Sequence, residues 1–273
     1  NRFADVASGG FNVVYEFRSI QEINEVEDYL RRAQSAGLKV IQNMPSCRAF
    51  SSDNPTCREW SAGVWSEQEW ARFISAAAAY DNLVAWYLPD EIRDYTAAAR
   101  LYRYVKTYDP KRRPVYGNPG SFDLSTIQRL ASSVDYLWAA AYPEYYAEPR
   151  AIVTYLMRQD AAACRSANCS WGAILQFFDS AAYGRARGYP TGRKLRADCY
   201  QAIIGGAKGI WLFTYEQGRN LPELWDAMRK VADEIVGSGG LDQVILSPAV
   251  PQTIVRSVVS GPSVAPTTRG VTY

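Results

Sequence analysis

The sequence predicts an α/β fold of the (β/α)8 barrel type, because short apolar runs with strand character alternate with segments of helical periodicity. The strand-like runs cover residues 11–16, 38–43, 83–88, 114–118, 134–142, 173–178 and 209–215. Regular strand–helix alternation indicates a parallel sheet, either wound on both faces or closed as a barrel. A length of 273 residues suits a single barrel, which typically has about 250 residues. The chain has no phosphate-binding motif after its first strand, which favours the barrel.

The segments between these runs carry apolar residues at helical spacing. One segment has Ile23, Val26, Leu30 and Ala33, and the next has Trp70, Phe73, Ile74 and Ala77. The second of these helices opens with Ser66 and Glu69, the pattern of a capping box. Further helices are expected at residues 97–108, 124–131, 152–163, 196–205 and 221–236, and another at 2–8 precedes the first strand-like run.

Seven strand-like runs are visible where a closed barrel has eight. We expect the first barrel strand to lie upstream of Asn1, or residues 243–246 to occupy its place. Beyond residue 240 the pattern changes to short β-branched runs interrupted by Pro, Gly and Ser, which indicates strands. The sequence therefore predicts a barrel domain over residues 1–240 and a β-rich tail over 241–273, either an arm or the start of a β-sandwich.

Composition excludes several classes of function. Thirty basic and 28 acidic side chains give a net charge of +2, which provides no electrostatic basis for a nucleic-acid partner. No apolar run approaches the roughly 20 residues of a membrane span. The absence of histidine excludes Ser-His-Asp catalysis and His-ligated metal sites, and there is no Gly-rich phosphate loop. We therefore expect no cofactor and no metal, with proton transfer by carboxylates, tyrosines, lysines or a free cysteine.

Four of the five cysteines lie in two closely spaced pairs. Cys47 and Cys57 flank a polar loop, and Cys164 and Cys169 flank a short segment before a strand. Two short disulfides are the prediction, with four free thiols as the alternative. Disulfides would indicate an oxidising compartment, so we expect an extracellular or secreted protein. Cys199 lies on an amphipathic helix and is expected to be a buried apolar residue.

Asp90 and Glu91 follow the apolar run 83–88 after a single proline, and they are the first candidates for chemistry. In a barrel the carboxyl ends of the strands form the active site, so acids at that position indicate catalysis. The alternative is that both acids cap the following helix, whose N-terminus favours negative charge. Their position at the exit of the strand favours the catalytic role.

Short motifs occur in a characteristic order along residues 1–236. They are Gly10-Phe11-Asn12, Gly37-Leu38-Lys39-Val40, Trp86-Tyr87-Leu88-Pro89-Asp90-Glu91, Asp109-Pro110, Arg113-Pro114-Val115, Tyr142-Pro143, Gln176-Phe177-Phe178 and Gly206-Ala207-Lys208-Gly209-Ile210. In this order they resemble the clan-A glycoside hydrolases, in particular bacterial (β/α)8 proteins with a strand ending in W-Y-L-x-D-E-P. The resemblance implies hydrolysis of a poly- or oligosaccharide. It also implies that the run 11–16 is the second barrel strand and that the acid pair ends the fourth, where the clan places its general acid.

Glu91 is therefore the first choice for the general acid, because the neighbouring Asp90 and an apolar wall from Trp86 are expected to raise the pKa of its carboxyl and keep it protonated. The chain departs from the clan at the seventh strand, where Gln176 stands in place of the nucleophilic glutamate, and Ile92 replaces the proline after the acid pair. Four other acids at strand ends are candidates for the second carboxylate: Glu216 first, then Glu16, and after them Glu144 and Asp179. Their alternative role is that of ordinary loop or salt-bridge acids.

Aromatic and amide side chains near the strand ends are expected to bind sugar, because flat rings stack on pyranose faces. The predicted substrate-binding residues are Asn43, Trp86, Tyr142, Gln176, Trp211 and Tyr215. Core packing is the alternative for about half of the aromatic residues, because strand residues alternate between two faces. A basic loop contains Arg185, Arg187, Arg193, Lys194 and Arg196. It indicates an anionic sugar or, as the alternative, a solvated loop.

A competing function follows from the departures from the clan. Without the nucleophile, and with one barrel strand absent from the pattern, the chain would be a catalytically inactive barrel with a glycan-binding or structural role. An unpaired sheet edge would then favour self-association. The two functions differ in whether the protein hydrolyses a carbohydrate or only binds it.

Overall fold

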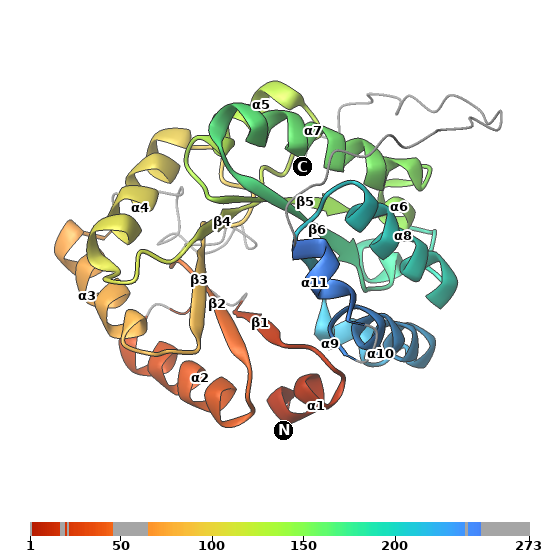
Figure 1. Ribbon diagram of the computed structural model, residues 1–273, viewed down its shortest axis with the longest axis horizontal. Coiled ribbons are helices and arrows are strands. Elements are labelled where there is room, and N and C mark those ends of the chain that lie inside the picture. Colours follow the sequence, from red (N-terminus) through yellow and green to blue (C-terminus); the bar gives the residue numbers. More distant parts are fainter. Residues whose placement is uncertain (1, 17–19, 21, 46–64, 238–239, 247–273) are drawn as a thin grey trace. The chain divides into compact units, whose positions relative to one another are not determined.

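The computed structural model describes residues 2–16, 20, 22–45, 65–237 and 240–246. Seven parallel strands form one sheet in the order β1-β2-β3-β4-β5-β6-β7 (Figure 1). They are β1 (Val13–Glu16), β2 (Lys39–Asn43), β3 (Leu83–Tyr87), β4 (Val115–Gly117), β5 (Tyr136–Ala141), β6 (Ser170–Gln176) and β7 (Ile210–Phe213). Because the strands follow one another in chain order, each connection steps to the next strand in one direction, as in a (β/α)8 fold and unlike the doubly wound alternative. The fold is thus an α/β fold of the TIM-barrel type, and all seven predicted strands are confirmed.

The helices confirm the predicted periodicity. They are α1 (Arg2–Ser8), α2 (Ile23–Ser35), α3 (Glu67–Ala78), α4 (Tyr95–Tyr108), α5 (Leu124–Ala131), α6 (Pro143–Tyr146), α7 (Ala151–Ala167), α8 (Gly192–Ile204), α9 (Tyr215–Gly218), α10 (Pro222–Val236) and α11 (Leu241–Leu246), with a short 3₁₀ helix, η2 (Ser180–Tyr183). The predicted capping box of α3 is present: the Ser66 N–H donates to Glu69 Oε2 at 2.6 Å, and the Glu69 N–H donates to Ser66 Oγ at 3.3 Å. In the described ranges, no helix has the length and apolarity needed to cross a membrane.

Residues 241–246 form the helix α11 and not a strand. The alternative in which residues 243–246 replace a barrel strand is therefore wrong. Near the end of α11, the carbonyl oxygen of Ile245 accepts a hydrogen bond from Lys208 Nζ at 2.7 Å. The rest of the predicted β-rich tail, from residue 247 onward, lies outside the described residues.

The chain divides into two compact units. Unit 1 comprises Asn1–Ala140 and Gln159–Gly172, and unit 2 comprises Ala141–Arg158 and Ala173–Tyr273. Unit 1 contains α1 to α5, β1 to β4 and most of β5, whereas unit 2 contains most of β6, all of β7 and helices α8 to α11. The strand end that carries the acid pair therefore belongs to unit 1, and the ends of β6 and β7 belong to unit 2.

The core of unit 1 lies between strands β1 to β4 and helices α2 to α4 (Figure 1). Trp86 of β3 is completely buried there, with its ring 6.4 Å from that of Phe73. The Trp86 indole N–H donates to Asp109 at 2.9 Å, and Asp109 forms a buried ion pair with Arg113 at 2.8 Å. Alternation along β3 thus directs Trp86 into the helix layer. It is a core residue and does not have the substrate-binding position that the sequence predicts.

The cysteines are described in part. Cys164 at the end of α7 and Cys169 before β6 form a disulfide, as predicted, with their Cα atoms 4.5 Å apart. Cys199 on α8 is buried and free, also as predicted. Cys47 and Cys57 lie outside the described residues.

Asp160 of α7 is completely buried in unit 1. Neither of its carboxylate oxygens has a hydrogen-bond partner among the residues that the structure describes. Burial raises the pKa of Asp160 well above its ordinary value, because the charged form loses its hydration. The folded protein therefore retains this proton at pH values where the unfolded chain has released it.

Asp160 should make the protein less stable as the pH rises. The unfolded chain releases this proton near about pH 4, so the contribution of Asp160 is fully present below that pH and is lost up to the raised pKa of the folded state. Within that window, the free energy of unfolding of the wild type should fall by about 1.4 kcal/mol per pH unit relative to that of Asp160→Asn. Urea denaturation of both proteins from about pH 4 to about pH 8 measures this difference.

The matched control is Asp226→Asn, which changes an exposed acid on α10. We expect the pH profile of its stability to run parallel to that of the wild type. Parallel profiles for Asp160→Asn as well would contradict the effect of burial on Asp160.

Candidate active site

The carboxyl ends of neighbouring strands lie level in unit 1. Asn43, the last residue of β2, is the register partner of Tyr87, the last residue of β3. Asp90 and Glu91 come three and four residues after Tyr87, and Asn118 follows β4 directly. In a TIM-barrel fold this edge of the sheet carries the active site. We call Asn43, Asp90, Glu91 and Asn118 the strand-end cluster.

Asp90 is held by donors from two strands. Its Oδ1 accepts from the Tyr87 hydroxyl at 2.8 Å and from Asn118 Nδ2 at 3.0 Å. Asn118 is oriented in turn, because its Oδ1 accepts from the Gly120 N–H at 3.0 Å. The end of β3 and the turn after β4 therefore fix the Asp90 carboxylate together. The backbone that carries its neighbour Glu91 is held in place as a result.

Glu91 has an unusual backbone conformation. Its φ of 56° lies in the left-handed region, which is costly for a residue with a side chain and persists mainly at functional sites. The Glu91 side chain lies directly against Gly120, itself at φ 55°, where an added Cβ would be only 2.7 Å from Glu91 Cβ. Two left-handed residues thus face each other at this strand end, and glycine is required at 120 for both reasons.

The alternative role of the acid pair as a helix cap is wrong. The residue that caps α4 is Asp94, whose side chain accepts from the Ala97 N–H at 2.9 Å. Asp90 and Glu91 lie upstream of this cap, in the connection between β3 and α4. Their position is therefore unexplained by the helix N-terminus.

Asn43 adds an acceptor to the strand-end cluster. Its side chain is only 3% exposed, and its Oδ1 has no hydrogen-bond partner among the described residues. Buried acceptors in native proteins nearly always have a partner, so an orphaned one at a strand end fits a hydroxyl donated by a ligand. The substrate-binding role of Asn43 stays a prediction.

Aromatic rings project from the same face of the sheet. The Tyr15 ring lies 4.8 Å from that of Tyr87, and the Tyr116 ring lies 4.7 Å from Tyr136 and 5.6 Å from Trp138. Burial raises the pKa of Tyr116, reinforced by Tyr136, so its phenol stays protonated and can donate. These rings offer flat apolar surface beside hydroxyl groups, which suits a sugar.

Tyr116, Trp138 and Gly120 are absent from the residues that the sequence predicts for the site. The Asn118-Pro119-Gly120 run is a turn signal that points to Gly120. Periodicity gives no comparable signal for Tyr116 or Trp138, because alternation along a strand defines two faces without saying which one meets the helices.

Glu16 lies on the face of β1 opposite to the aromatic rings. It is 1% exposed, and its Oε2 accepts from the Ile20 N–H at 3.3 Å. Successive strand residues point to opposite faces, so Glu16 lies opposite Tyr15, whose ring contacts Tyr87. This geometry favours a structural role in the connection after β1 over the predicted catalytic one.

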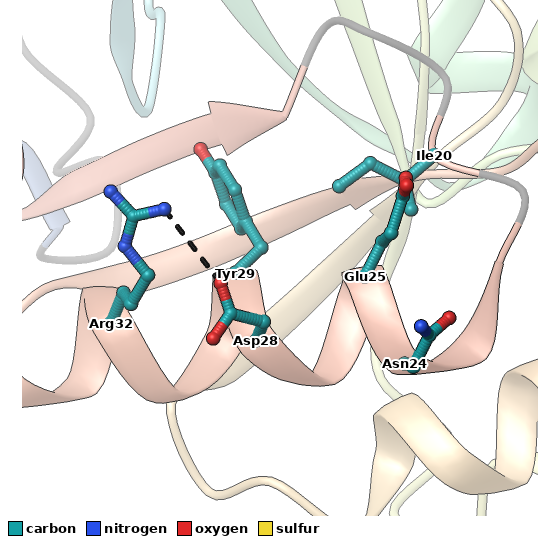
Figure 2. A pocket seen from close by; sticks show the side chains of 6 residues that line it. All are labelled: Ile20, Asn24, Glu25, Asp28, Tyr29 and Arg32. Carbon is teal, nitrogen blue, oxygen red and sulfur yellow. Dashed lines mark ion pairs between the residues drawn. The ribbon is translucent and has the colours of Figure 1, made fainter.

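A pocket of about 320 Å³ lies along α2 in unit 1 (Figure 2). It is lined by Ile20, Asn24, Glu25, Asp28, Tyr29 and Arg32. All of these residues except Ile20 belong to α2, and Figure 2 shows Asp28 directed to Arg32, with which it pairs at 3.7 Å. No member of the strand-end cluster lines this pocket, so the depression is a charged helix surface and is distinct from the candidate site.

In unit 2, Gln176 at the end of β6 is 1% exposed and bonded through its whole amide group. Its Oε1 accepts from the Tyr145 N–H at 3.1 Å. Its Nε2 donates to Ser180 Oγ at 2.9 Å and to the carbonyl oxygens of Phe178 and Gly188 at 3.2 and 3.4 Å. Gln176 therefore holds the loop after β6 in place, a contact pattern that leaves little of it for substrate.

The remaining predicted binding residues of unit 2 are half-buried aromatics. Tyr142 contacts Tyr146 at 5.6 Å and Phe178 at 5.2 Å between ring centres. Tyr215 contacts Trp225 at 5.9 Å, and Trp211 lies in β7. All of them keep some exposed surface, so they remain compatible with ligand contact.

The other candidate acids of unit 2 differ in their surroundings. Glu144 is nearly buried and forms ion pairs with Arg150 and with Lys194. Arg150 also pairs with Asp198, whose pKa burial raises to about 6 against the opposing effect of Arg150. These groups form a charge-balanced structural cluster.

Asp179 and Glu216 lie at the loops of unit 2. Asp179 caps the 3₁₀ helix η2 by accepting from the Ala181 N–H at 2.9 Å. Glu216 is exposed on α9, immediately after β7. Among the three predicted acids of this unit, Glu144, Asp179 and Glu216, only Glu216 has an exposed side chain. In the described part of the chain, no group of three or more Cys, Asp or Glu side chains is placed to hold a metal ion.

No protein family model matches the sequence, and no curated protein does. The fold is similar to that of a family 2 β-galacturonidase from Eisenbergiella tayi, with a TM-score of 0.55 and 11% identity over 86% of this chain and 46% of that one. A glycoside hydrolase family 5 enzyme from Prevotella bryantii gives a TM-score of 0.52 and 11% identity over 85% of both chains. Fungal β-1,4-galactanases give a TM-score of 0.52 and 13% identity over 77% of this chain and 79% of theirs.

The likeness to these structures concerns the fold. The chain spans less than half the length of the β-galacturonidase and most of the length of the other two. The TM-scores of 0.52–0.55 show a similar architecture, identities of 11–13% show no more than that, and function depends on the side chains placed on the fold. The chain thus has an α/β fold of the TIM-barrel type, like that of solved glycoside hydrolases.

Proposed function

We propose that the protein is a glycoside hydrolase that cleaves a poly- or oligosaccharide with Glu91 as its general acid. The observation that carries the proposal is the acid pair after β3, in which Asp90 is fixed by Tyr87 and Asn118 while Glu91 has a left-handed backbone. Strain of this kind is retained where it positions a functional group. The likeness of the fold to solved glycoside hydrolases supports the same activity.

The chemistry follows from the groups at this edge. The Glu91 carboxyl would give its proton to the glycosidic oxygen as the bond from that oxygen to the anomeric carbon breaks. Asn43 Oδ1 would accept a hydrogen bond from a sugar hydroxyl, since it has no other partner among the described residues. A second carboxylate must act as nucleophile or activate water. On the sequence pattern, and because its side chain is exposed, Glu216 stays our proposal for that role.

The disulfide between Cys164 and Cys169 supports an extracellular location. Disulfides persist mainly in oxidising compartments, and polysaccharide substrates are found outside the cell. We therefore propose that the protein acts after secretion.

A second candidate function is glycan binding without hydrolysis. The observation that favours it is Gln176, which replaces the expected nucleophile and is bonded to the loop after β6. An amide in these contacts cannot form a glycosyl ester. A barrel with this substitution would bind carbohydrate through its aromatic and polar side chains without cleaving it.

The test is a panel of neutral and uronate polysaccharides incubated with the wild-type protein. Release of reducing ends measures hydrolysis, and affinity electrophoresis on the same polymers measures binding. Hydrolysis of any member supports the hydrolase, and retarded migration without new reducing ends supports the binding protein. A folded protein that neither cleaves nor binds any polymer would contradict both functions.

Gly120→Ala should impair hydrolysis by displacing Glu91. The new Cβ would lie 2.7 Å from Glu91 Cβ, and the left-handed backbone adds strain of about 1–3 kcal/mol. Gly37→Ala is the matched control, because Gly37 also has a positive φ of 74° but has open space around its Cβ position. We expect both variants to lose stability in urea denaturation, Gly120→Ala more because of the clash, with reduced kcat for Gly120→Ala alone. Equal kcat values for the two variants would contradict a role of Gly120 in positioning Glu91.

A further inference from the structure

The loop after β6 in unit 2 has both basic and aromatic side chains on its surface. We define the arginine–tyrosine loop as residues 179–189, between β6 and α8. Tyr183, Arg185, Arg187 and Tyr189 are exposed, and the two tyrosines are 44% and 38% accessible. Because two exposed tyrosines and two exposed arginines lie together on one short loop, the loop is a candidate binding surface.

The base of the loop is tied by hydrogen bonds. The Ser180 N–H donates to the Gly188 carbonyl oxygen at 2.9 Å, which closes the loop on itself. Gln176 Nε2 donates to Ser180 Oγ and to the same Gly188 carbonyl, as described above. Asp179 caps the turn that leads to Tyr183. A loop fixed in this way loses little conformational entropy when it binds a ligand.

The Tyr183 ring of the loop packs on two aromatic rings that lie outside the loop. The Tyr183 ring lies 5.0 Å from Phe178 and 6.1 Å from Tyr145. Its hydroxyl accepts from Gln217 Nε2 at 3.2 Å. The Arg185 guanidinium lies 5.3 Å above the Tyr145 ring, in a cation–π arrangement. The Tyr183 ring and the Arg185 guanidinium therefore both pack against Tyr145.

The charge of this region is strongly unbalanced. Residues 179–197 contain five bases and one acid. Two of the bases are neutralised, because Lys194 pairs with Glu144 and Arg196 pairs with Glu234. The others, Arg185, Arg187 and Arg193, form no ion pair within the described ranges. Since the net charge of the whole chain is only +2, this is a local concentration of positive charge and not part of a broad basic face.

We propose that the arginine–tyrosine loop binds an acidic carbohydrate, a chain of sugars that carry carboxylates as in uronic acids. Arg185 and Arg187 would each meet a carboxylate with two parallel N–H donors, the geometry that guanidinium and carboxylate share. Tyr183 and Tyr189 would contact the flat faces of the sugar rings. The inference rests on the proposed function, because that function makes the ligand a carbohydrate. It adds that the carbohydrate is acidic.

The test measures binding apart from turnover. Isothermal titration of the Glu91→Gln protein with an oligogalacturonate is compared with titration by the same oligosaccharide after reduction of its carboxyl groups to alcohols. Linkage and length are identical, so the difference reports the carboxylates alone. We expect affinity at least about tenfold lower for the reduced ligand, the range of a charge-assisted hydrogen bond. We also expect the affinity for the acidic ligand to fall with added salt.

Variants locate the contact. The double variant Arg185→Ala/Arg187→Ala should lose about tenfold or more in affinity for the oligogalacturonate. The matched control Arg103→Ala removes an exposed arginine on α4 of unit 1 and should leave the affinity unchanged. Tyr183→Ala should weaken the binding of both the acidic and the reduced ligand. Equal affinities for the two ligands, or an equal loss in Arg103→Ala, would overturn the proposal.

Two further titrants separate carbohydrate from charge. Poly-glutamate and an abasic single-stranded oligonucleotide of the same charge as the oligogalacturonate should bind at least about tenfold more weakly, because neither offers the pyranose faces that Tyr183 and Tyr189 would contact. Binding as tight as that of the oligogalacturonate would identify a general anion surface and overturn the sugar assignment. Acidic-sugar binding by a wild type without turnover would leave this inference standing and remove the hydrolase; turnover of neutral polymers without acidic-sugar binding would do the reverse.

Discussion

Replacement of Glu91 by glutamine is expected to lower kcat for polysaccharide hydrolysis by about 10²–10⁴-fold, the usual contribution of a general acid. The amide keeps the size of the side chain but has no carboxyl proton to give to the leaving oxygen. The loss should be much smaller for aryl glycosides, whose phenolate leaves without being protonated. Steady-state kinetics on a polysaccharide and on a nitrophenyl glycoside measure this contrast, and it reports an acid and not a fold defect.

The matched control for Glu91→Gln is Asp94→Asn. Asp94 lies in the same connection between β3 and α4 and caps α4, a role that asparagine fills equally well. We expect wild-type kinetics on both substrates from this variant. An equal loss of activity on both kinds of substrate in Glu91→Gln would show that Glu91 has a role other than proton donation.

Asp109→Ala is expected to destabilise the protein by about 3–5 kcal/mol, the usual result of removing one partner of a buried ion pair. Arg113 is 6% exposed and would keep its charge without a carboxylate. The Trp86 indole N–H would lose its acceptor at the same time. The guanidinium would then keep only neutral partners, the carbonyl oxygens of Ala78 and Tyr80, and the indole N–H would be buried without an acceptor in the core of unit 1. Urea denaturation followed by tryptophan fluorescence measures the change in the free energy of unfolding.

Asp81→Ala is the matched control for Asp109→Ala. Asp81 pairs with Lys111, two residues before Arg113, but its side chain is 81% exposed. Surface ion pairs contribute about 0–1 kcal/mol, so the stability should change little. If Asp109→Ala unfolds the protein outright, Asp109→Asn keeps an acceptor for the indole and should retain a measurable transition of reduced stability. Equal effects of Asp81→Ala and Asp109→Ala would contradict the role of burial.

The elements of the fold were predictable because their signals are local. The helix at residues 124–131 and the capping box at Ser66 depend on side chains within one or two turns, and the structure has both where they are predicted. The disulfide between Cys164 and Cys169 closes a short segment for the same reason. The order of the strands in the sheet depends on long-range pairing, yet chain order predicts it once the alternation of strands and helices is recognised.

The candidate site was predictable in part. The position of Asp90 and Glu91 after an apolar run is visible in the sequence, because the end of a strand has a defined place in a parallel α/β fold. Their partners are not visible, since Asn118 and Gly120 come from a strand about thirty residues away and meet the acids only in the fold. The left-handed backbone of Glu91 likewise has no signature in its residue type.

Local chemistry in the chain was sufficient for the strands, the helices, one disulfide and the place of the acid pair. Which face of each strand meets the helices was a matter of three-dimensional packing: Trp86 lies in the core with Asp109, whereas Tyr87 beside it holds Asp90. The same holds for Gln176, whose amide is bonded to a loop that follows it. The physical reason is that alternation defines two equivalent faces, and only contacts between residues distant in sequence make them different.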